Sequence, residues 1–289
     1  MSRNLIARIA VAVVAVPIIL WICYEGGYWL FGMVSLLALL GMAEFLINEG
    51  YRAKNLFFWF GLVIVALILA SRSGISTQWF LWLQILFGGV SGVLVFFLIS
   101  GMLLATGTRP PPELFKQHSR LVWGVAYIGL LYPYVYQLGT GYNEIPGVSV
   151  TGGDWLLFLF GLLWVGDTAA MGIGSWLGRH KLAPAVSPNK TVEGFVGGII
   201  GAIVIGIVMY FWKFNDLAIY HILILSVGCS IFGQLGDLVE SMWKRSLGIK
   251  DSSAIIPGHG GVLDRFDSLL FAAPFMFYYK LLIIVSASS

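Results

Sequence analysis

Charged residues and cysteines are scarce in this chain of 289 residues. Only 11% of the residues are Asp, Glu, Lys or Arg, whereas 58% are hydrophobic and the mean hydropathy is +0.88. A soluble globular domain carries about 25% charged residues, so this composition argues against one. The two cysteines, Cys23 and Cys229, form no CxxC motif and lie in or beside apolar segments. We therefore expect them to pack in the interior rather than to carry redox or zinc chemistry.

Continuous apolar runs take the place of the missing charge. About 20 apolar residues in a helix cross a hydrocarbon core of roughly 30 Å, and such runs recur along the whole chain. Segments that alternate in polarity, which are typical of a membrane-spanning barrel, are absent from the sequence. We predict an all-α polytopic integral membrane protein with about nine transmembrane helices, at residues 5–23, 27–47, 55–70, 79–105, 121–138, 155–178, 192–212, 218–236 and 266–286.

The distribution of lysine and arginine predicts the orientation of these spans. Cytoplasmic loops of membrane proteins carry an excess of both residues. With the N-terminus in the cytoplasm, only Arg72 and Lys213 fall in outer loops, and Lys280 lies within the last span. The other fourteen are then cytoplasmic: Arg3, Arg8, Arg52, Lys54, Arg109, Lys116, Arg120, Arg179, Lys181, Lys190, Lys244, Arg245, Lys250 and Arg265. The first run resembles a signal peptide but has no convincing cleavage site after it, so we expect a retained helix.

Ionisable residues are distributed unevenly between the two halves of the chain. Such residues are costly inside a bilayer and usually functional. In the second half they occur within or at the ends of spans: Asp167, Glu193, Asp237, Glu240, Asp264 and Asp267. We therefore interpret residues 1–150 as an N-terminal scaffold of transmembrane helices and residues 151–289 as a C-terminal catalytic region whose site faces the cytoplasm.

Glycines four residues apart occur in two segments of the second half. "GFVGGIIG" contains the pairs Gly194 and Gly198, and Gly197 and Gly201, and "GIGSWLG" contains Gly174 and Gly178. This spacing is typical of closely packed membrane helices. Neither segment fits the dinucleotide-binding motif, and no GxxxxGK[ST] phosphate loop occurs in the chain.

Acidic and basic residues gather around the loop before the last span, in "GDLVESMWKRSLGIKDSSAIIPGHGGVLDRFDS". On a helix, Asp237, Glu240, Ser241 and Lys244 fall within an arc of about 100°. Asp264 and Asp267 lie three residues apart at the start of the next helix. Since one loop joins the two helix ends, we expect their carboxylates to converge.

This collection of groups is suited to phosphoryl or nucleotidyl transfer. Clustered carboxylates repel one another unless a cation lies among them, and oxygen ligands favour Mg²⁺ or Mn²⁺ over zinc. The basic side chains would meet phosphate oxygens, and Gly260 and Gly261 would let a polyphosphate approach the backbone. A solvated cytoplasmic loop is the alternative, but it explains the cations without explaining the interleaved acids. The basic side chains are Lys244, Arg245, Lys250 and Arg265.

Two neighbouring segments are candidates for the same site. In "SPNKTVEG", Ser187 or Asn189 can cap the following helix, whose N-terminus and Lys190 would attract anions. Glu193 is either a capping-box carboxylate or a site residue. Asp167, inside the sixth span, is expected to pair with a cation of the site or with a polar neighbour, because an unpaired buried acid is costly.

The segments that contain these residues resemble those of a known family. The stretch "SMWKRSLGIKDSSAIIPGHGGVLDRFD" is similar to the signature of phosphatidate cytidylyltransferases, also called CDP-diacylglycerol synthases. The similarity extends to "WVGDTAAMGIGSWLG" and "KLAPAVSPNKTVEGFVGG" and covers roughly residues 155–270. Every fixed position of the signature is met: Ser241, Lys244, Arg245, Lys250, Asp251, His259, Gly260, Gly261, Asp264, Arg265 and Asp267.

The resemblance implies a reaction of phospholipid biosynthesis in which CTP and phosphatidate give CDP-diacylglycerol and pyrophosphate. It also implies Mg²⁺, with two metal ions in each site and room for a monovalent ion, a bacterial cytoplasmic (inner) membrane location, and a homodimer. No nucleic acid is expected as a partner.

The same resemblance suggests roles for individual residues. It implies Asp237, Asp264 and Asp267 as metal ligands, and these three with Lys244 and His259 as the catalytic set. His259 would orient a phosphate oxygen or a metal-bound water, although a loop histidine without a special role is an equal alternative. The residues expected to bind substrate are Lys190, Asn189, Ser241, Arg245, Lys250, Arg265, Gly260 and Gly261.

Three other functions compete with this interpretation. A CDP-alcohol phosphotransferase would carry DGxxAR followed by GxxxDxxxD, which the sequence lacks. A CTP-dependent polyprenol kinase is closer in chemistry and differs in its product. A transporter would need polar residues along a path to the outer face, whereas the acids of this chain gather at cytoplasmic helix ends.

Overall fold

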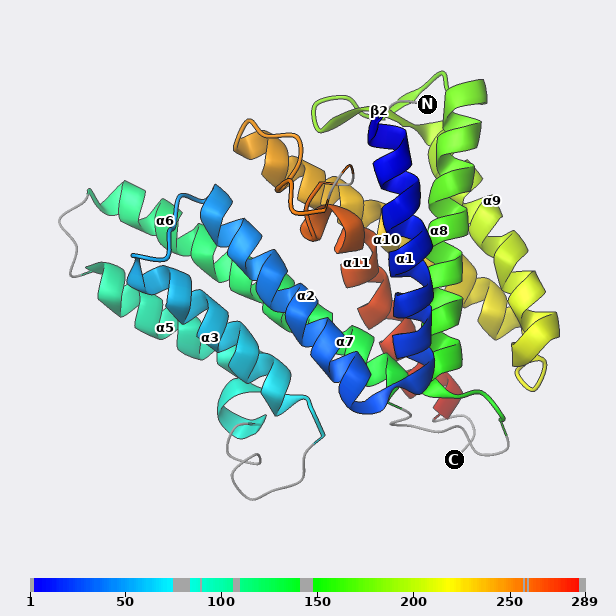
Figure 1. Ribbon diagram of the computed structural model, residues 1–289, viewed down its shortest axis with the longest axis horizontal. Coiled ribbons are helices and arrows are strands. Elements are labelled where there is room, and N and C mark those ends of the chain that lie inside the picture. Colours follow the sequence, from blue (N-terminus) through cyan, green and yellow to red (C-terminus); the bar gives the residue numbers. More distant parts are fainter. Residues whose placement is uncertain are drawn as a thin grey trace. The chain divides into compact units, whose positions relative to one another are not determined.

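The computed structural model describes residues 3–74, 84–88, 90–105, 110–140, 148–256, 258 and 260–285 (Figure 1). The chain divides into two compact units, one formed by residues up to Leu30 together with those from Gln137 onward, and the other by Phe31–Tyr136. The predicted division into scaffold and catalytic region at residue 150 concerns function, and it stays a prediction.

The larger unit is a helical bundle interrupted by one short hairpin. Its helices are α1 (Arg3–Glu25), α8 (Gly152–Leu177), α9 (Val192–Met209), α10 (Ile219–Ser246) and α11 (Leu263–Tyr279). Single π-helical turns, η2 (Tyr210–Phe214) and η3 (Lys280–Val285), continue α9 and α11. Between α8 and α9, strands β1 (Lys181–Ala183) and β2 (Ser187–Thr191) form an antiparallel pair. The all-α class is confirmed, and the hairpin is a feature that the sequence did not predict.

The described residues of the smaller unit form helices joined by loops. It is built from α2 (Gly27–Asn48), α3 (Leu56–Ser71), α5 (Val90–Ala105), α6 (Pro111–Gly124), the π-helical turn η1 (Val125–Gly129) and α7 (Leu130–Gly139), with the ends of α2 and α7 reaching into the larger unit. Asn55 caps α3, because its side chain accepts a hydrogen bond from the Phe57 amide at 2.9 Å.

Six helical segments of the described chain are long and apolar enough to cross a membrane. They are Gly27–Asn48, Pro111–Gly139, Gly152–Leu177, Val192–Phe214, Ile219–Ser246 and Leu263–Ile284. The other three predicted spans overlap shorter apolar helices, Val13–Glu25, Leu56–Ser71 and Val90–Leu104, and residues 79–83 and 89 of the predicted span 79–105 lie outside the described residues. The chain is therefore a polytopic integral membrane protein, but the predicted count of nine crossings is not confirmed.

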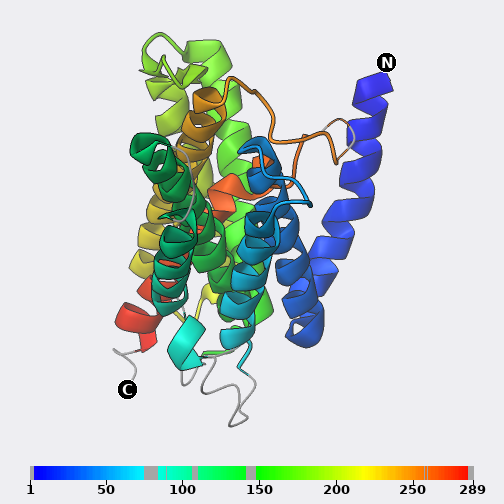
Figure 2. The same cartoon turned by 90° about the vertical axis from the view of Figure 1, so that its left-hand side faces the viewer.

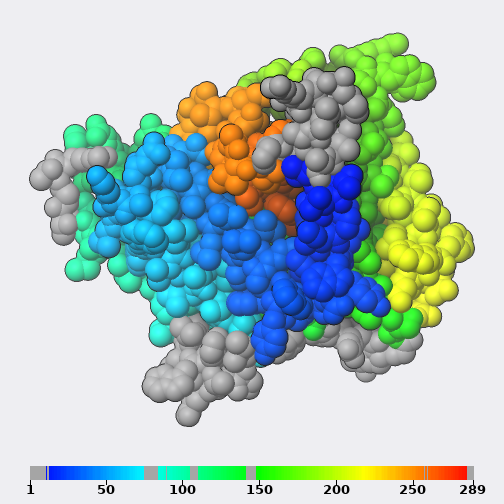
Figure 3. Space-filling model, viewed as in Figure 1, coloured from blue at the N-terminus to red at the C-terminus, as the bar shows by residue number. Residues whose placement is uncertain are grey.

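Helices α8 and α9 lie side by side (Figure 3), and their glycines bring the two backbones close together. A Cβ atom on Gly194 would lie 2.8 Å from the Ala170 carbonyl oxygen, and one on Gly201 would lie 2.5 Å from the Ala169 Cβ. Real Cβ atoms do not approach other atoms so closely, so only glycine permits this contact. The prediction of close packing from the four-residue spacing is confirmed.

Side-chain caps fix where α8 and α9 begin. The Thr151 amide donates to Asp154 Oδ2 at 2.8 Å and the Asp154 amide donates to Thr151 Oγ1 at 3.3 Å, which is a capping box. At α9, Thr191 Oγ1 accepts from the Gly194 amide at 3.1 Å. The expectation that Ser187 or Asn189 would cap this helix is wrong, because both residues lie in strand β2.

The α8–α9 contact predicts a difference between two valine substitutions. Gly201→Val places side-chain atoms against Ala169, and overpacking of this kind costs about 1–3 kcal/mol. We expect a lower midpoint of thermal unfolding in detergent. Gly172→Val in α8 is the matched control, because a Cβ at Gly172 meets nothing within 4 Å. Equal shifts in the two variants would contradict this account of the contact.

Candidate active site

A cavity of about 660 Å³ lies within the larger unit, between α8, β2, α10, α11 and the loop that follows α10. Seven of the predicted site residues line it: Asn189, Lys190, Asp237, Lys244, Asp264, Arg265 and Asp267. The sequence-based prediction that these side chains meet at one place is supported by this common cavity. Its remaining walls are partly apolar, with Phe160, Leu163, Trp164, Met171, Leu182, Phe195 and Leu269.

Lys190 and Asp237 form an ion pair across this cavity. Lys190 Nζ on β2 lies 2.6 Å from Asp237 Oδ2 on α10. The Ser241 hydroxyl, one helical turn beyond, donates to Asp237 Oδ1 at 3.2 Å. Both oxygens of Asp237 thus have partners, and Ser241 acts on the site through this carboxylate.

Lys244 forms a second, more deeply buried ion pair. Its Nζ lies 2.6 Å from Asp264 Oδ1 at the start of α11 and 3.4 Å from Glu240 Oε1, and the Lys244 residue is 9% exposed. Glu240 itself is completely buried. Because a buried charge is tolerated only when it is paired, this ammonium group holds α10 and the start of α11 together.

Asp264 also organises the loop that precedes it. Its second oxygen, Oδ2, accepts from the Ser252 amide at 2.8 Å, from the Ser252 hydroxyl at 3.0 Å and from the Gly261 amide at 2.8 Å. Gly260 has a φ of +86°, and a Cβ there would lie 2.8 Å from Asp264 Oδ2. The glycines predicted to approach a polyphosphate therefore approach Asp264 in this structure.

Two further carboxylates face the same cavity. Asp267 is 9% exposed, and its Oδ1 accepts from the Ser268 amide at 2.6 Å. Asp167 on α8 lies close enough to Asp237 and Asp267 for their negative charges to repel, and close enough to Lys190 and Arg265 for attraction. The expectation that Asp167 pairs with a site cation is consistent with these two basic neighbours.

The oxygen atoms of these carboxylates are suitable ligands for a hard divalent cation. In this structure, however, Asp237 and Asp264 are each paired with a lysine. Asp167, Asp237 and Asp267 offer only oxygen ligands, which suit Mg²⁺. Among the described residues, no three His, Cys, Asp or Glu side chains are placed to hold one metal ion. Lys190 and Lys244 occupy the positions beside Asp237 and Asp264. A cation that joined these carboxylates would therefore compete with the two ammonium groups.

The other predicted site residues that the structure describes do not line the cavity: Ser241, Arg245, Lys250, Gly260 and Gly261. Arg245 donates to two main-chain carbonyl oxygens, those of Val186 and Ile249, and Lys250 is exposed on the loop after α10. Glu193 is not a capping-box residue of the predicted kind, because its carboxylate accepts from the Arg179 and His180 amides and from His180 Nδ1. His259 lies outside the residues that the structure describes.

Sequence reasoning omitted two polar residues that shape this region. Gln234 lines the cavity, and its Nε2 donates to the Phe195 carbonyl and to Ser230 Oγ, both at 3.2 Å. The sequence could have indicated Gln234 as a site residue, because it lies within a span three residues before Asp237 and polar residues in spans are often functional. Ser252 gave no such signal, because a serine in a loop is common and its role depends on the position of Asp264.

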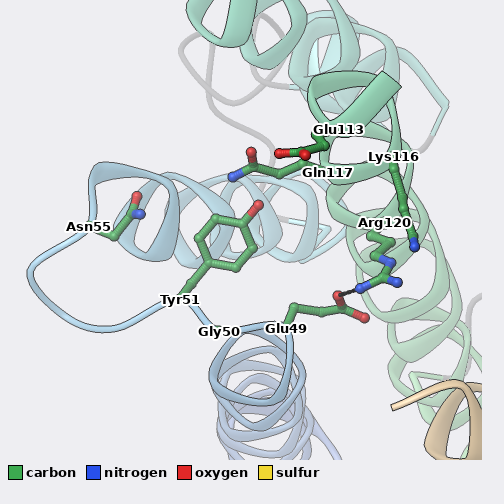
Figure 4. Close-up of a pocket in the computed structure, with 8 residues that line it drawn as sticks. All are labelled: Glu49, Gly50, Tyr51, Asn55, Glu113, Lys116, Gln117 and Arg120. Atoms are coloured by element: carbon green, nitrogen blue, oxygen red, sulfur yellow. Dashed lines mark hydrogen bonds and ion pairs between the residues drawn. The ribbon is translucent and has the colours of Figure 1, made fainter. Parts of the chain in front are cut away.

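A smaller cavity of about 290 Å³ lies in the smaller unit (Figure 4). Its side chains come from the loop that follows α2 and from α6, and Arg120 Nη1 lies 2.9 Å from Glu49 Oε2. None of the predicted site residues lines it: its lining is Glu49, Gly50, Tyr51, Asn55, Glu113, Lys116, Gln117 and Arg120. The cavity of the larger unit is therefore the candidate active site.

Comparison with known proteins finds similar sequences over nearly the whole chain. The sequence profile described as "Cytidylyltransferase family" matches residues 6–283. A phosphatidate cytidylyltransferase of Staphylococcus haemolyticus (strain JCSC1435) is 35% identical over 269 residues, which cover 93% of this chain and 96% of the relative. One of Staphylococcus epidermidis (strain ATCC 12228) is 35% identical over 272 residues, with the same coverage. One of Staphylococcus saprophyticus is 43% identical over 162 residues, 56% of this chain and 58% of the relative.

The contact between Gly260 and Asp264 predicts the effect of an added methyl group. Gly260→Ala introduces a left-handed alanine, which costs roughly 1–2 kcal/mol, and also displaces Asp264 from its donors. Gly248→Ala is the matched control, because Gly248 has a φ of +71° but a Cβ there meets nothing within 4 Å. We expect Gly260→Ala to lower the midpoint of thermal unfolding in detergent more than Gly248→Ala. Equal midpoints would show that the contact does not matter for stability.

Proposed function

The chain belongs to the cytidylyltransferase family and is a nucleotidyltransferase, and we propose that it transfers the cytidylyl group of CTP to phosphatidate. The products are CDP-diacylglycerol and pyrophosphate. The observation that carries this proposal is the cavity of the larger unit, which joins lysine–aspartate pairs to apolar walls within an integral membrane protein. The names of the curated relatives support the same reaction.

The composition of the cavity suits one soluble and one lipid substrate. Lys190, Lys244 and Arg265 supply positive charge for the phosphates. Trp164 and Met171 line the cavity and are 39% and 73% exposed, so its apolar side is continuous with the surface of α8. The diacylglycerol part of phosphatidate is apolar and would contact this side, while its phosphate would reach the basic side chains.

The reaction needs charge neutralisation more than it needs a base. Phosphatidate is a phosphate monoester whose oxygen attacks the α-phosphorus of CTP, and the bond from that phosphorus to the oxygen of the β-phosphate breaks. The electron pair of this bond leaves with pyrophosphate. The main barrier is the approach of two anions, and fixed positive charges lower it. Lys190 and Lys244 would exchange their present carboxylate partners for phosphate oxygens.

We further propose that Asp237, Asp264 and Asp267 hold Mg²⁺, with two metal ions in each site. When bound, these ions neutralise phosphate charge and bring the two substrates together. Asp264 would keep its loop donors through one oxygen, Oδ2, and use Oδ1, which now faces Lys244. Asn189 and Arg265 are proposed substrate-binding residues, because they line the same cavity.

The proposed setting is the bacterial cytoplasmic membrane, with the N-terminus and the active site on the cytoplasmic side. The excess of lysine and arginine in the loops of that side supports this orientation, and CTP is available there. We also propose that the protein acts as a homodimer.

Purified protein supplied with Mg²⁺, CTP and phosphatidate is expected to form CDP-diacylglycerol and one pyrophosphate for each product molecule. EDTA should abolish both products because the proposed metal ions are removed. Lipid products separated by chromatography and identified by mass spectrometry provide the measurement. Phosphorylation of a polyprenol instead, or no lipid product at all, would refute the proposed reaction.

Asp264→Asn is expected to reduce turnover by at least about a hundredfold, comparable to the loss of a group that stabilises charge in a transition state. The substitution keeps the size of the side chain but removes the charge that faces Lys244. Elution of the variant as folded protein in detergent is the control that separates a loss of turnover from a loss of the ion pair with Lys244. Near-normal turnover would remove Asp264 from the proposed metal ligands.

Lys190→Met is expected to raise the apparent KM for CTP and to lower turnover by about tenfold or more, since one charge-assisted bond to phosphate contributes roughly 1.5–3 kcal/mol. Lys181→Met is the matched control, because Lys181 lies on the same hairpin but does not line the cavity. Steady-state kinetics in mixed micelles would compare the two. Unchanged kinetics of Lys190→Met would exclude Lys190 from the site.

A further inference from the structure

Arg245 joins the hairpin to the loop that follows α10. It lies in the last turn of α10, and its Nε donates to the Val186 carbonyl oxygen at 3.3 Å while its Nη1 donates to the Ile249 carbonyl oxygen at 2.8 Å. Val186 lies between β1 and β2, where its amide closes the turn on the Ala183 carbonyl at 3.1 Å. The hairpin and this loop lie at the same end of the larger unit (Figure 2).

Polar contacts attach the hairpin to the bundle at its base, along β2 and at its tip. At its base, Glu193 accepts from the Arg179 amide at 3.0 Å and from His180 Nδ1 at 2.7 Å. Along β2, Lys190 pairs with Asp237. At its tip, Arg245 holds the turn through Val186. An isolated two-stranded hairpin is marginally stable, so these attachments determine where its side chains lie.

The position of the hairpin matters because β2 forms one wall of the cavity. Asn189, Lys190 and Thr191 line the cavity, whereas Arg245 does not. Arg245 is exposed, and its Nε and Nη1 atoms both donate to main-chain oxygens. A planar guanidinium can donate in two directions at once, which the single ammonium group of a lysine does less well.

We infer that Arg245 is a positioning residue, which holds the tip of the hairpin at 181–191 against the loop after α10 and thereby places Lys190 in the cavity. This role replaces the direct phosphate contact that the sequence suggested for Arg245. The placement of the hairpin by Arg245 follows from the hydrogen bonds alone, whereas the effect of Arg245 on turnover rests on the proposed function.

Hydrogen–deuterium exchange of the full chain in detergent tests the structural part without any activity. Loss of the two hydrogen bonds in Arg245→Ala should raise amide exchange at residues 183–191 by about tenfold, because the tip of the hairpin loses its attachment to the loop after α10. Arg245→Lys, which keeps the charge, should raise it as well. Arg179→Ala is the matched control, because it removes a nearby exposed arginine whose backbone amide alone contacts Glu193. Exchange in Arg245→Ala equal to that of the control would overturn the inference.

A double-mutant cycle with Lys190 tests the consequence for the reaction. If Arg245 acts by placing Lys190, Arg245→Ala should lower turnover with CTP in the wild-type background but cause no further loss in the Lys190→Met background. A direct phosphate contact would instead give independent losses, and that result would overturn the inference. If no variant and no wild-type protein forms product, the proposed function fails, and the exchange experiment still decides the role of Arg245.

Discussion

Two lysine–aspartate pairs are the interactions on which the arrangement of the larger unit depends. Lys190 Nζ lies 2.6 Å from Asp237, and Lys244 Nζ lies 2.6 Å from Asp264. Each pair joins two different elements, since one links β2 to α10 and the other links α10 to α11, the next helix along the chain. The side chains of Lys244 and Asp264 are only 11% and 3% exposed, so each charge needs the other as a partner, whereas those of Lys190 and Asp237 are 26% and 36% exposed. The same charges that stabilise the cavity are therefore those that a pair of phosphorylated substrates would meet.

Small residues make these pairs possible by bringing the backbones close. Gly194 and Gly201 let α9 lie against α8, which sets β2 and Lys190 beside the cavity. Gly260 leaves room for Asp264 Oδ2, which then receives the amides of Ser252 and Gly261. The acidic side chains are thus positioned by close backbone contacts as well as by the ion pairs.

The part of this structure that follows from local spacing could be predicted from the sequence. Asp237, Ser241 and Lys244 share one helix face because of the helical repeat, and the four-residue spacing of glycines indicated the α8–α9 contact. The partners of Lys190 and Arg245 could not be predicted. Lys190 meets a carboxylate 47 positions away, and Arg245 binds main-chain oxygens, which every residue carries. The sequence did not predict the hairpin, because its strands have only three and five residues. The predicted number of crossings is not confirmed, because three of the apolar helices are shorter than a full membrane span.

We propose that the carboxylates now paired with lysines, Asp237 and Asp264, become ligands of metal ions when CTP enters the cavity. Binding of Mn²⁺, a paramagnetic substitute for Mg²⁺, measures this directly through the electron paramagnetic resonance signal of the free ion. The account predicts that adding CTP to the wild-type protein lowers the free Mn²⁺ signal beyond what CTP does alone, and that Asp237→Asn loses this additional decrease. An equal decrease in both proteins, or none in the wild type, would contradict it.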